Sequence, residues 1–305
     1  MGLFLGLSFG IFELFLPENI ARRLKKLPFL VLIVTKASIY TILVFLVTAI
    51  LGLISGLIQG KLIEELWQGF LSMGHIITII MTVVCYTIII FFLQISRIMG
   101  SGVLLRFLSG KYHKPVEEER IFMFLDIKSS TSMAEKLGHK KFYALLNSFF
   151  RLITEPVLLT RAEIYQYVGD EIVLTWNTEY GFRDANCLKI FYLIKKTIEK
   201  NRENFKNEFG MVPDFKAAVH YGKAIVGLIG DLKREFVFNG DVLNTTARMQ
   251  ELCNQYKQDL IISRKLLTKL KFPENLEQEY LGKVHLKGKE NEIHLYGIHQ
   301  KSIKS

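Results

Sequence analysis

The sequence predicts an α+β protein, in which a ferredoxin-like βαββαβ core is preceded by an all-α transmembrane region. Two observations lead to this prediction. Charge-free apolar segments are confined to the first hundred residues, and from residue 119 onward strand-like and helix-like patterns follow one another in the order β-α-β-β-α-β. With 50% hydrophobic residues and a mean hydropathy of +0.25, the chain is too apolar for an ordinary soluble protein.

Two segments near the start are long enough to cross a membrane. Residues 37–58 and 75–95 contain no Asp, Glu, Lys or Arg, and each matches the roughly 20 apolar residues that span about 30 Å of hydrocarbon. Residues 3–16 are shorter and interrupted by Glu13, so they form a third span, an interfacial helix, or the end of a span that begins upstream of Met1. The predicted organisation is a transmembrane region of about three helices (1–96), a linker and dimerisation helix (97–118), a polar domain (119–299) and a basic tail (300–305).

Loop charges orient these spans. The connector 17–27 contains four cations in "RRLKK", whereas the connector 59–74 has one lysine against two glutamates. The positive-inside rule then places residues 17–27 and everything after residue 96 in the cytosol. We expect a multi-pass protein of the cell inner (cytoplasmic) membrane, with membrane lipid as a partner and its polar half in the cytosol.

The polar half is basic. The first hundred residues hold seven basic and four acidic residues, so the remainder carries +7 of the net charge of +10. Such an excess fits an anionic membrane surface or an anionic substrate. There is no long Lys/Arg run or zinc-finger spacing, so we expect no nucleic-acid partner. Cys85, Cys187 and Cys253 form no CxxC pair, which argues against a disulfide framework or a zinc site.

Strand and helix patterns alternate through the polar domain. A strand at 119–127 precedes a helix from about Thr131 to Arg151, and a β-hairpin follows at 162–168 and 171–177. We expect the helices to cover one face of a mainly antiparallel sheet. The later expected elements are a polar helix near 182–208, two strands in 214–231 hinged at Tyr221-Gly222, a helix at 240–255, a strand at 259–263 and two short terminal strands.

Two aspartates fall at points that this fold brings together. Asp126 ends the first strand and Asp170 lies at the tip of the hairpin, and the first and third strands of the fold are neighbours. Taken singly, Asp126 is explained as a residue near a helix N-cap and Asp170 as a turn former. Together they predict a site for Mg²⁺ and a polyphosphate, with the Ile127 carbonyl as a further ligand and free N–H groups around residues 128–132 holding phosphate oxygens.

Four segments carry a family resemblance. "FMFLDIKSSTSMAEKLG", "YVGDEIV", "AVHYGKAIVGLIG" and "GDVLNTTARM" resemble the successive motifs of class III adenylate/guanylate cyclases, and the resemblance covers about residues 118–299. The hydrophobic region and short linker before them resemble membrane-anchored bacterial members. The resemblance implies a homodimer with active sites across the interface, a nucleoside triphosphate substrate, and two Mg²⁺ or Mn²⁺ ions per site. The product would be a 3′,5′-cyclic nucleotide, with release of pyrophosphate.

The resemblance also implies roles for individual residues. Asp126 and Asp170 match the two metal-binding aspartates, Asn244 the asparagine that orients the ribose, and Arg248 the arginine that stabilises transition-state charge on the α-phosphate. Asn244 and Arg248 would come from the opposite protomer. The substrate-binding set implied is Lys128, Ser129, Ser130, Thr131, Gln166, Gly169, Val237 and Lys287, with Lys289 close enough to be an alternative to Lys287.

The residues that would read the base depart from the family pattern. Gln166 stands where members that prefer ATP commonly have lysine, and Val237 stands where Asp or Thr is usual. Glutamine can donate and accept, so it suits either adenine or guanine. A shift of one position would bring Asn239 into the base site instead. The nucleotide stays open, with ATP favoured because it is more abundant and adenylate cyclases are the commoner members.

Other functions fit parts of the pattern. The "GDE" turn is also typical of diguanylate cyclases, but these would have a second glycine at Val168 and no need for Asn244 or Arg248. A catalytically silent nucleotide-binding signalling module is supported only by Gln166 and Val237. An adenylate cyclase, with a guanylate cyclase as the alternative, is therefore the leading prediction, and Glu171 has no assigned chemistry in it.

Overall fold

The computed structural model describes residues 27–59, 73–99, 108–285 and 292–301. The chain divides into two compact units, Met1–Met99 and Gly100–Ser305, and each is described by itself. The predicted helix near residues 3–16 lies outside the described residues, as does most of the predicted tail.

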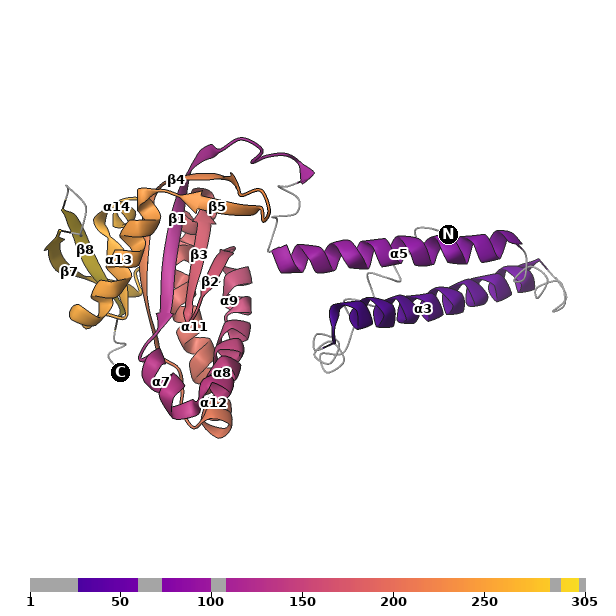
Figure 1. Cartoon of the computed structure of the whole chain (residues 1–305), viewed down its shortest axis with the longest axis horizontal. Helices are drawn as coiled ribbons and strands as arrows, with labels where there is room; N and C mark the ends of the chain where they lie inside the picture. Colours follow the sequence, from indigo (N-terminus) through magenta and orange to yellow (C-terminus); the bar gives the residue numbers. More distant parts are fainter. Residues whose placement is uncertain (1–26, 60–72, 100–107, 286–291, 302–305) are drawn as a thin grey trace. The chain divides into compact units, whose positions relative to one another are not determined.

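The first unit contains two long helices, α3 (Phe29–Ile58) and α5 (Met73–Met99) (Figure 1). They pack through Tyr40 and Val44 of α3 and Tyr86 and Ile90 of α5, with the two tyrosine rings 5.8 Å apart. Helix α3 begins eight residues before the predicted start because apolar residues continue upstream of Lys36, whose side chain is buried. Both helices are long and apolar enough to cross a membrane.

A third stretch, His139–Leu159, also meets the length and hydropathy of a span. It belongs to the second unit, where Leu145 and Phe149 are fully buried against the sheet. Its apolar character is therefore explained by the core of that unit.

The second unit is built on an eight-stranded sheet in the order β2-β3-β1-β4-β6-β8-β7, with β5 paired to β4. Strand β1 lies between β3 and β4 and is antiparallel to both, as the ferredoxin-like prediction requires. The strands are β1 (Val116–Ile127), β2 (Glu163–Val168), β3 (Glu171–Asn177), β4 (Phe215–Ile229), β5 (Glu235–Asn239), β6 (Leu260–Ser263), β7 (Leu276–Val284) and β8 (Ile293–Gln300). The α+β fold predicted from the sequence is confirmed.

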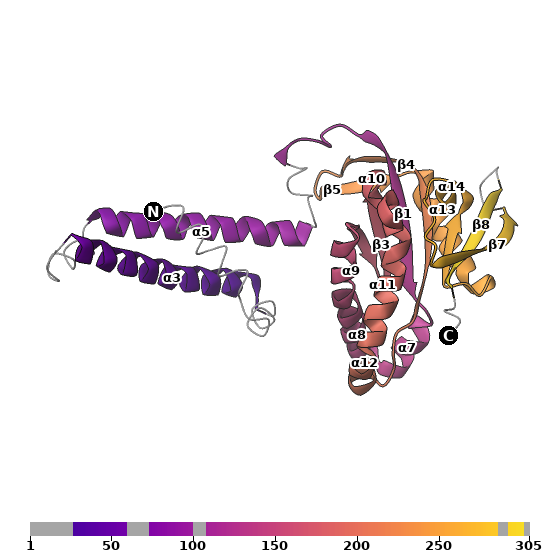
Figure 2. The ribbon, with the colours of Figure 1, turned by 180° about the vertical axis from the view of Figure 1, so that it is seen from behind.

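Helices cover both faces of this sheet rather than one. Met123 and its odd-numbered neighbours on β1 pack against α8, α9 and α11, whereas Phe122 and Phe124 face α13. Figure 2 shows α8, α9 and α11 together on one side of the sheet. The unbroken apolar run "IFMFL" in β1 fits this burial on both faces. The helices are α7 (Ser130–Leu137), α8 (His139–Leu152), α9 (Thr154–Leu159), α10 (Thr178–Phe182), a 3-10 turn (Arg183–Ala185), α11 (Asn186–Lys200), α12 (Arg202–Phe209), α13 (Asp241–Gln255) and α14 (Arg264–Leu267).

Two predicted elements differ from the structure for reasons that involve glycine. The helix predicted from Thr131 to Arg151 is broken at Gly138, which has a φ of 74°. The hinge predicted at Tyr221-Gly222 is absent, and β4 runs continuously past it in register with β1. A Cβ on Gly222 would lie 3.1 Å from Val242, so this glycine permits the close approach of α13 to the sheet.

Candidate active site

The two predicted aspartates lie together at one edge of the sheet. Asp126, near the end of β1, is in register with Glu171 at the start of β3, and Asp170 is the preceding turn residue. Gly169 has a φ of 63°, which lets the hairpin turn tightly. Burial raises the pKa of Asp126, and a hydrogen bond with Asp170 and the repulsion of its charge raise it further.

Asp126 is held by two side chains that sequence reasoning missed. The Nε2 of Gln250 on α13 donates a hydrogen bond to Asp126 Oδ2 at 2.9 Å, and the Nζ of Lys216 on β4 lies 3.5 Å from the same oxygen. Both side chains are buried. Lys216 stands directly opposite Asp126 in the β1–β4 ladder. The lysine within the apolar strand "FKAAVHY" could have indicated this contact, because a buried lysine requires an acidic partner.

Glu171 is part of the same acidic cluster. It opposes Asp126 in the ladder, so the two side chains lie on the same face of the sheet. Burial, followed by repulsion from Asp126 and Asp170, raises the pKa of Glu171 to about 7. Among the residues that the structure describes, three carboxyl groups of this cluster face the ammonium of Lys216, which leaves an excess of negative charge.

These carboxyl groups do not form a complete metal cage. Within the residues that the structure describes, no group of three or more His, Cys, Asp or Glu side chains is arranged to hold a metal ion by itself. Mg²⁺ typically takes only one or two protein carboxylates and completes its shell with water and substrate phosphates. The donor set of Asp126 and Asp170 fits that type of site.

The segment after Asp126 is only partly available to a ligand. The N–H of Lys128 donates to the Asp214 carbonyl at 2.9 Å, so the prediction that this N–H is free is wrong. Ser129 adopts a left-handed conformation with a φ of 55° and makes no side-chain capping bond to α7, which begins at Ser130. The N–H groups of the first turn of α7, including those of Ser130 and Thr131, have no intrahelical acceptors and suit an anion. Ile127 is buried and paired with Phe215.

Helix α13 carries the predicted ribose and phosphate residues on its accessible side. Asn244 is exposed and Arg248 half-buried, and they are one turn apart on one helix face. Gln250 follows Arg248 by two residues, which places it about 200° around the helix. The same helix therefore presents Gln250 to Asp126 of its own chain and directs Arg248 elsewhere.

Gln166 and Val237, the residues predicted to contact the base, are each next in the chain to a residue that joins β2 to β5. The N–H of Phe238 donates to the hydroxyl of Tyr165 at 3.2 Å, and the rings of these residues lie 5.1 Å apart. Gln166 follows Tyr165 and is exposed, and Val237 precedes Phe238. Strand alternation turns Val237 to the opposite side of β5 from Phe238, and Asn239 to the same side as Val237. Lys287 and the alternative Lys289 lie outside the described residues.

The family model of the adenylate and guanylate cyclase catalytic domain matches residues 112–300. The chain belongs to this family.

Relatives of this cyclase-family chain bear adenylate cyclase names. Adenylate cyclase 2 of Rhizobium meliloti (strain 1021) is 37% identical over 201 residues, which cover 66% of this chain and 55% of the relative. The adenylate cyclase of Anabaena cylindrica is 24% identical over 182 residues, which cover 58% of this chain and 36% of the relative. The chain thus spans about half the length, or less, of these curated relatives.

Solved cyclase structures share the fold. A bacterial light-regulated adenylyl cyclase aligns with a TM-score of 0.61 at 21% identity, covering 72% of this chain and 65% of that structure. The adenylyl cyclase CyaB from P. aeruginosa aligns with a TM-score of 0.54 at 15% identity, covering 62% of this chain and 98% of that structure. The family match extends from just before β1 through the end of β8, so the whole sheet of the second unit is a cyclase domain.

Proposed function

We propose that this chain is a membrane-bound nucleotidyl cyclase that converts ATP to 3′,5′-cyclic AMP and pyrophosphate at a homodimer interface. The meeting of Asp126 and Asp170 in a half-buried acidic cluster, next to the first turn of α7, is the observation that carries the proposal. The 37% identity to a protein named adenylate cyclase 2 supports it.

The acidic cluster fits divalent cations. Burial and, after it, repulsion between the carboxyl groups raise the pKa values of Asp126 and Glu171, and a bound cation would remove that repulsion. We assign Asp126 and Asp170 as ligands of two Mg²⁺ or Mn²⁺ ions, with the Ile127 carbonyl as an additional donor. Metal held there would activate the ribose 3′-hydroxyl and would neutralise charge on the triphosphate. The hydrogen bond from Gln250 fixes the orientation of the Asp126 carboxylate, the proposed ligand of these ions.

The proposed dimer follows from the two sides of α13. Arg248 lies about 200° around the helix from Gln250, so it leaves the helix on the side away from the cluster that Gln250 contacts within its own chain. A second copy of the chain would bring its Asn244 to the ribose and its Arg248 to the α-phosphate, where a guanidinium stabilises the charge that develops during transfer. Ser129, Ser130, Thr131 and Gly169 remain assigned to phosphate binding beside the metal site, with Lys287 as a further phosphate contact.

The proposed substrate is ATP, and GTP is the second candidate. Gln166 is exposed beside the β2–β5 contact, and its amide can pair with the edge of adenine or guanine. Val237 adds no hydrogen bond that would choose between them. We further propose that the cytoplasmic membrane holds α3, α5 and residues 3–16, and that the cyclase domain lies in the cytosol.

An assay of the full chain in membranes tests the proposed reaction. Membranes containing the protein are incubated with ATP and, in parallel, with GTP, each with Mn²⁺ or Mg²⁺, and cyclic nucleotide is quantified. We expect cyclic AMP from the native chain and none from Asp126→Ala. Turnover of GTP in preference to ATP would replace the adenylate assignment, and a folded dimer that cyclises neither would overturn the enzyme proposal.

A mixing experiment tests the shared site. We expect Asp170→Ala and Arg248→Ala chains each to be inactive alone, whereas their heterodimer would contain one site with every native residue. We expect co-expression to restore measurable activity, up to about half of the native rate per heterodimer. If co-purified heterodimers stay inactive, the two halves of the site do not come from different protomers.

A further inference from the structure

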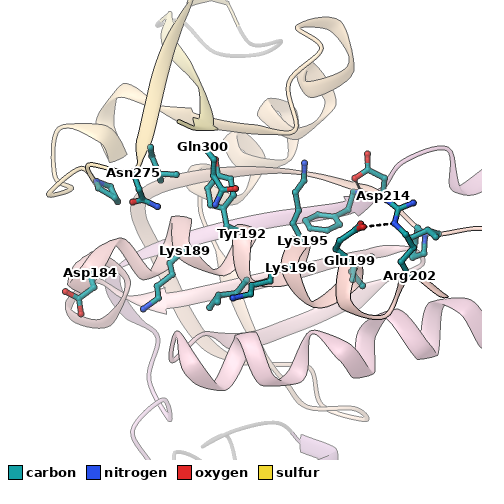
Figure 3. A pocket seen from close by; sticks show the side chains of 17 residues that line it. Asp184, Lys189, Tyr192, Lys195, Lys196, Glu199, Arg202, Asp214, Asn275 and Gln300 are labelled. Carbon is teal, nitrogen blue, oxygen red and sulfur yellow. Dashed lines mark hydrogen bonds and ion pairs between the residues drawn. The ribbon is translucent and has the colours of Figure 1, made fainter. Parts of the chain in front are cut away.

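A large cavity lies away from the proposed catalytic residues. Its volume is about 970 Å³, and its lining contains none of Asp126, Asp170, Asn244 or Arg248. Figure 3 shows α11 forming one wall, with the segments before β4 and β7 and the end of β8 around it. A volume of this size is at the upper end of the range of small-molecule sites.

Helix α11 presents two cations to this cavity. Lys189 and Lys196 are seven residues apart, so they lie on one helix face about 10 Å from each other along the axis. Both are exposed, and neither makes an ion pair or hydrogen bond with another described residue. Tyr192 and Leu193 lie between the two lysines along α11, so the part of the cavity wall between the two charges is apolar.

The other polar groups of the lining complement an anion. Asn275 and Gln300 supply amide groups opposite α11 (Figure 3). The acid Glu199 is engaged by Arg202 at 2.8 Å, which leaves Asp184 as an exposed acid at one end of the cavity. Among the described residues of the lining, unpaired cations therefore outnumber unpaired acids.

The cavity wall is connected to the end of β1 through ion pairs. Lys195 and Asp214 both line the cavity. Asp214 binds Lys128 at 2.7 Å, and Lys195 and Lys128 both pair with Asp259. Lys128 follows Asp126 by two residues. A ligand that displaces Asp214 or Lys195 would therefore change the contacts of the segment that carries the proposed metal ligand.

We propose that this cavity is a regulatory binding site for a soluble organic anion, in which an apolar or planar body packs on Tyr192 and Leu193 and a phosphate or carboxylate group pairs with Lys189 or Lys196. Occupancy changes the cyclisation rate through Asp214, Lys195 and Lys128. The binding site stands independently of the proposed function, whereas the effect on rate rests on it.

Lysine labelling tests the binding site without using activity. The full chain in detergent is treated with pyridoxal 5′-phosphate, an organic phosphate whose aldehyde condenses with lysine amines; the adducts are reduced with borohydride and mapped by mass spectrometry. We expect Lys189 or Lys196 to label several-fold faster than Lys200, which is exposed on the same helix and does not line the cavity. Pyridoxamine 5′-phosphate, which lacks the aldehyde, should protect the first two and not Lys200. Equal labelling of all three, or no protection, overturns the site.

The cyclase rate tests the regulatory part. We expect saturating pyridoxamine 5′-phosphate to change the rate of the native chain by about two-fold or more, with no such change in Lys189→Gln/Lys196→Gln and an undiminished change in Lys200→Gln. Protection without any change in rate overturns the regulatory part, and a change that persists in the double variant assigns the effect to another site. If the chain cyclises no nucleotide yet Lys189 or Lys196 is protected, the proposed function fails and the binding site stands.

Discussion

Two charged clusters stand two residues apart near the end of β1 and differ in how their charges are balanced. Around Asp126, three carboxyl groups face one lysine, and the pKa of Asp126 is raised. Around Lys128, the carboxylates of Asp214 and Asp259 face two ammonium groups. The partners of Asp126 come from α13 and β4, whereas the cluster of Lys128 reaches α11 through Lys195.

This difference in charge balance indicates that the Asp126 cluster is a binding site and that the Lys128 cluster connects parts of the fold. Charge excess in a half-buried cluster is unfavourable unless a ligand neutralises it, so the Asp126 cluster is suited to bind cations. In the Lys128 cluster the charges are matched, and hydrogen bonds with Lys128 and Lys195 lower the pKa of Asp259 even though burial alone would raise it. Those ion pairs join β1, β4, β6 and α11, and their expected contribution is to stability.

Removing a carboxylate from the first cluster should give the largest effect. We expect Asp126→Asn to lower kcat by more than about 100-fold, because loss of a metal ligand exceeds the 10–100-fold cost of losing an outer-shell partner. Thermal unfolding should show a midpoint equal to or above that of the native chain, since partial burial and the charge of Asp170 disfavour the ionised form of Asp126 in the native chain. A variant that is inactive because it is unfolded would contradict this interpretation of the cluster.

The hydrogen bond from Gln250 should give the next largest effect. We expect Gln250→Leu to raise the metal concentration required for half-maximal rate by about 10-fold, with a smaller change in kcat at saturating metal. Gln255→Leu is the matched control, because Gln255 is exposed on the same helix. An effect on kcat alone, with unchanged metal dependence, would mean that Gln250 does not act through Asp126.

The contrast between the clusters also shows where sequence reasoning is strong. The hairpin predicted at 162–168 and 171–177 matches β2 and β3 within one residue, because alternating apolar residues and a Gly-Asp turn are local signals. The meeting of Asp126 with the hairpin tip followed from the strand order of the fold.

The side chains that contact Asp126 and Lys128 could not be predicted from local sequence patterns. The contacts of Lys216 and Gln250 with Asp126 depend on the β1–β4 register and on the face that α13 covers, and neither is encoded in a local pattern. Gly222 was interpreted as a hinge because glycine commonly ends a strand, whereas its role is to admit Val242 of α13. The phosphate-binding prediction for Lys128 rests on its backbone N–H, and it misses the ion pairs of the side chain because Asp214 and Asp259 are 86 and 131 residues away in the chain.

Breaking the second cluster should affect stability more than chemistry. We expect Lys128→Met to lower the free energy of unfolding by about 1 kcal/mol, the upper range for partly exposed ion pairs, and to change kcat by less than about five-fold. Urea unfolding of the full chain in detergent measures the first and the cyclase assay the second. Lys140→Met is the control, since Lys140 is exposed and makes no ion pair with a described residue. A loss of activity as large as that of Asp126→Asn would contradict the division between the two clusters.

The pH dependence of stability should show the smallest effect. The folded-state pKa of Asp259 lies below its unfolded value, so its ion pairs stabilise the fold above the unfolded carboxyl range and the contribution is lost as pH falls through the folded-state pKa. We therefore expect the urea midpoint of the native chain to fall more steeply below about pH 4 than that of Asp259→Asn. Fluorescence of the buried Trp176 reports on the cyclase domain once Trp67 is replaced by phenylalanine in both chains. Parallel curves would mean that the charge of Asp259 is not what joins β6 to β1 and α11, and the balanced cluster would then owe its stability to packing.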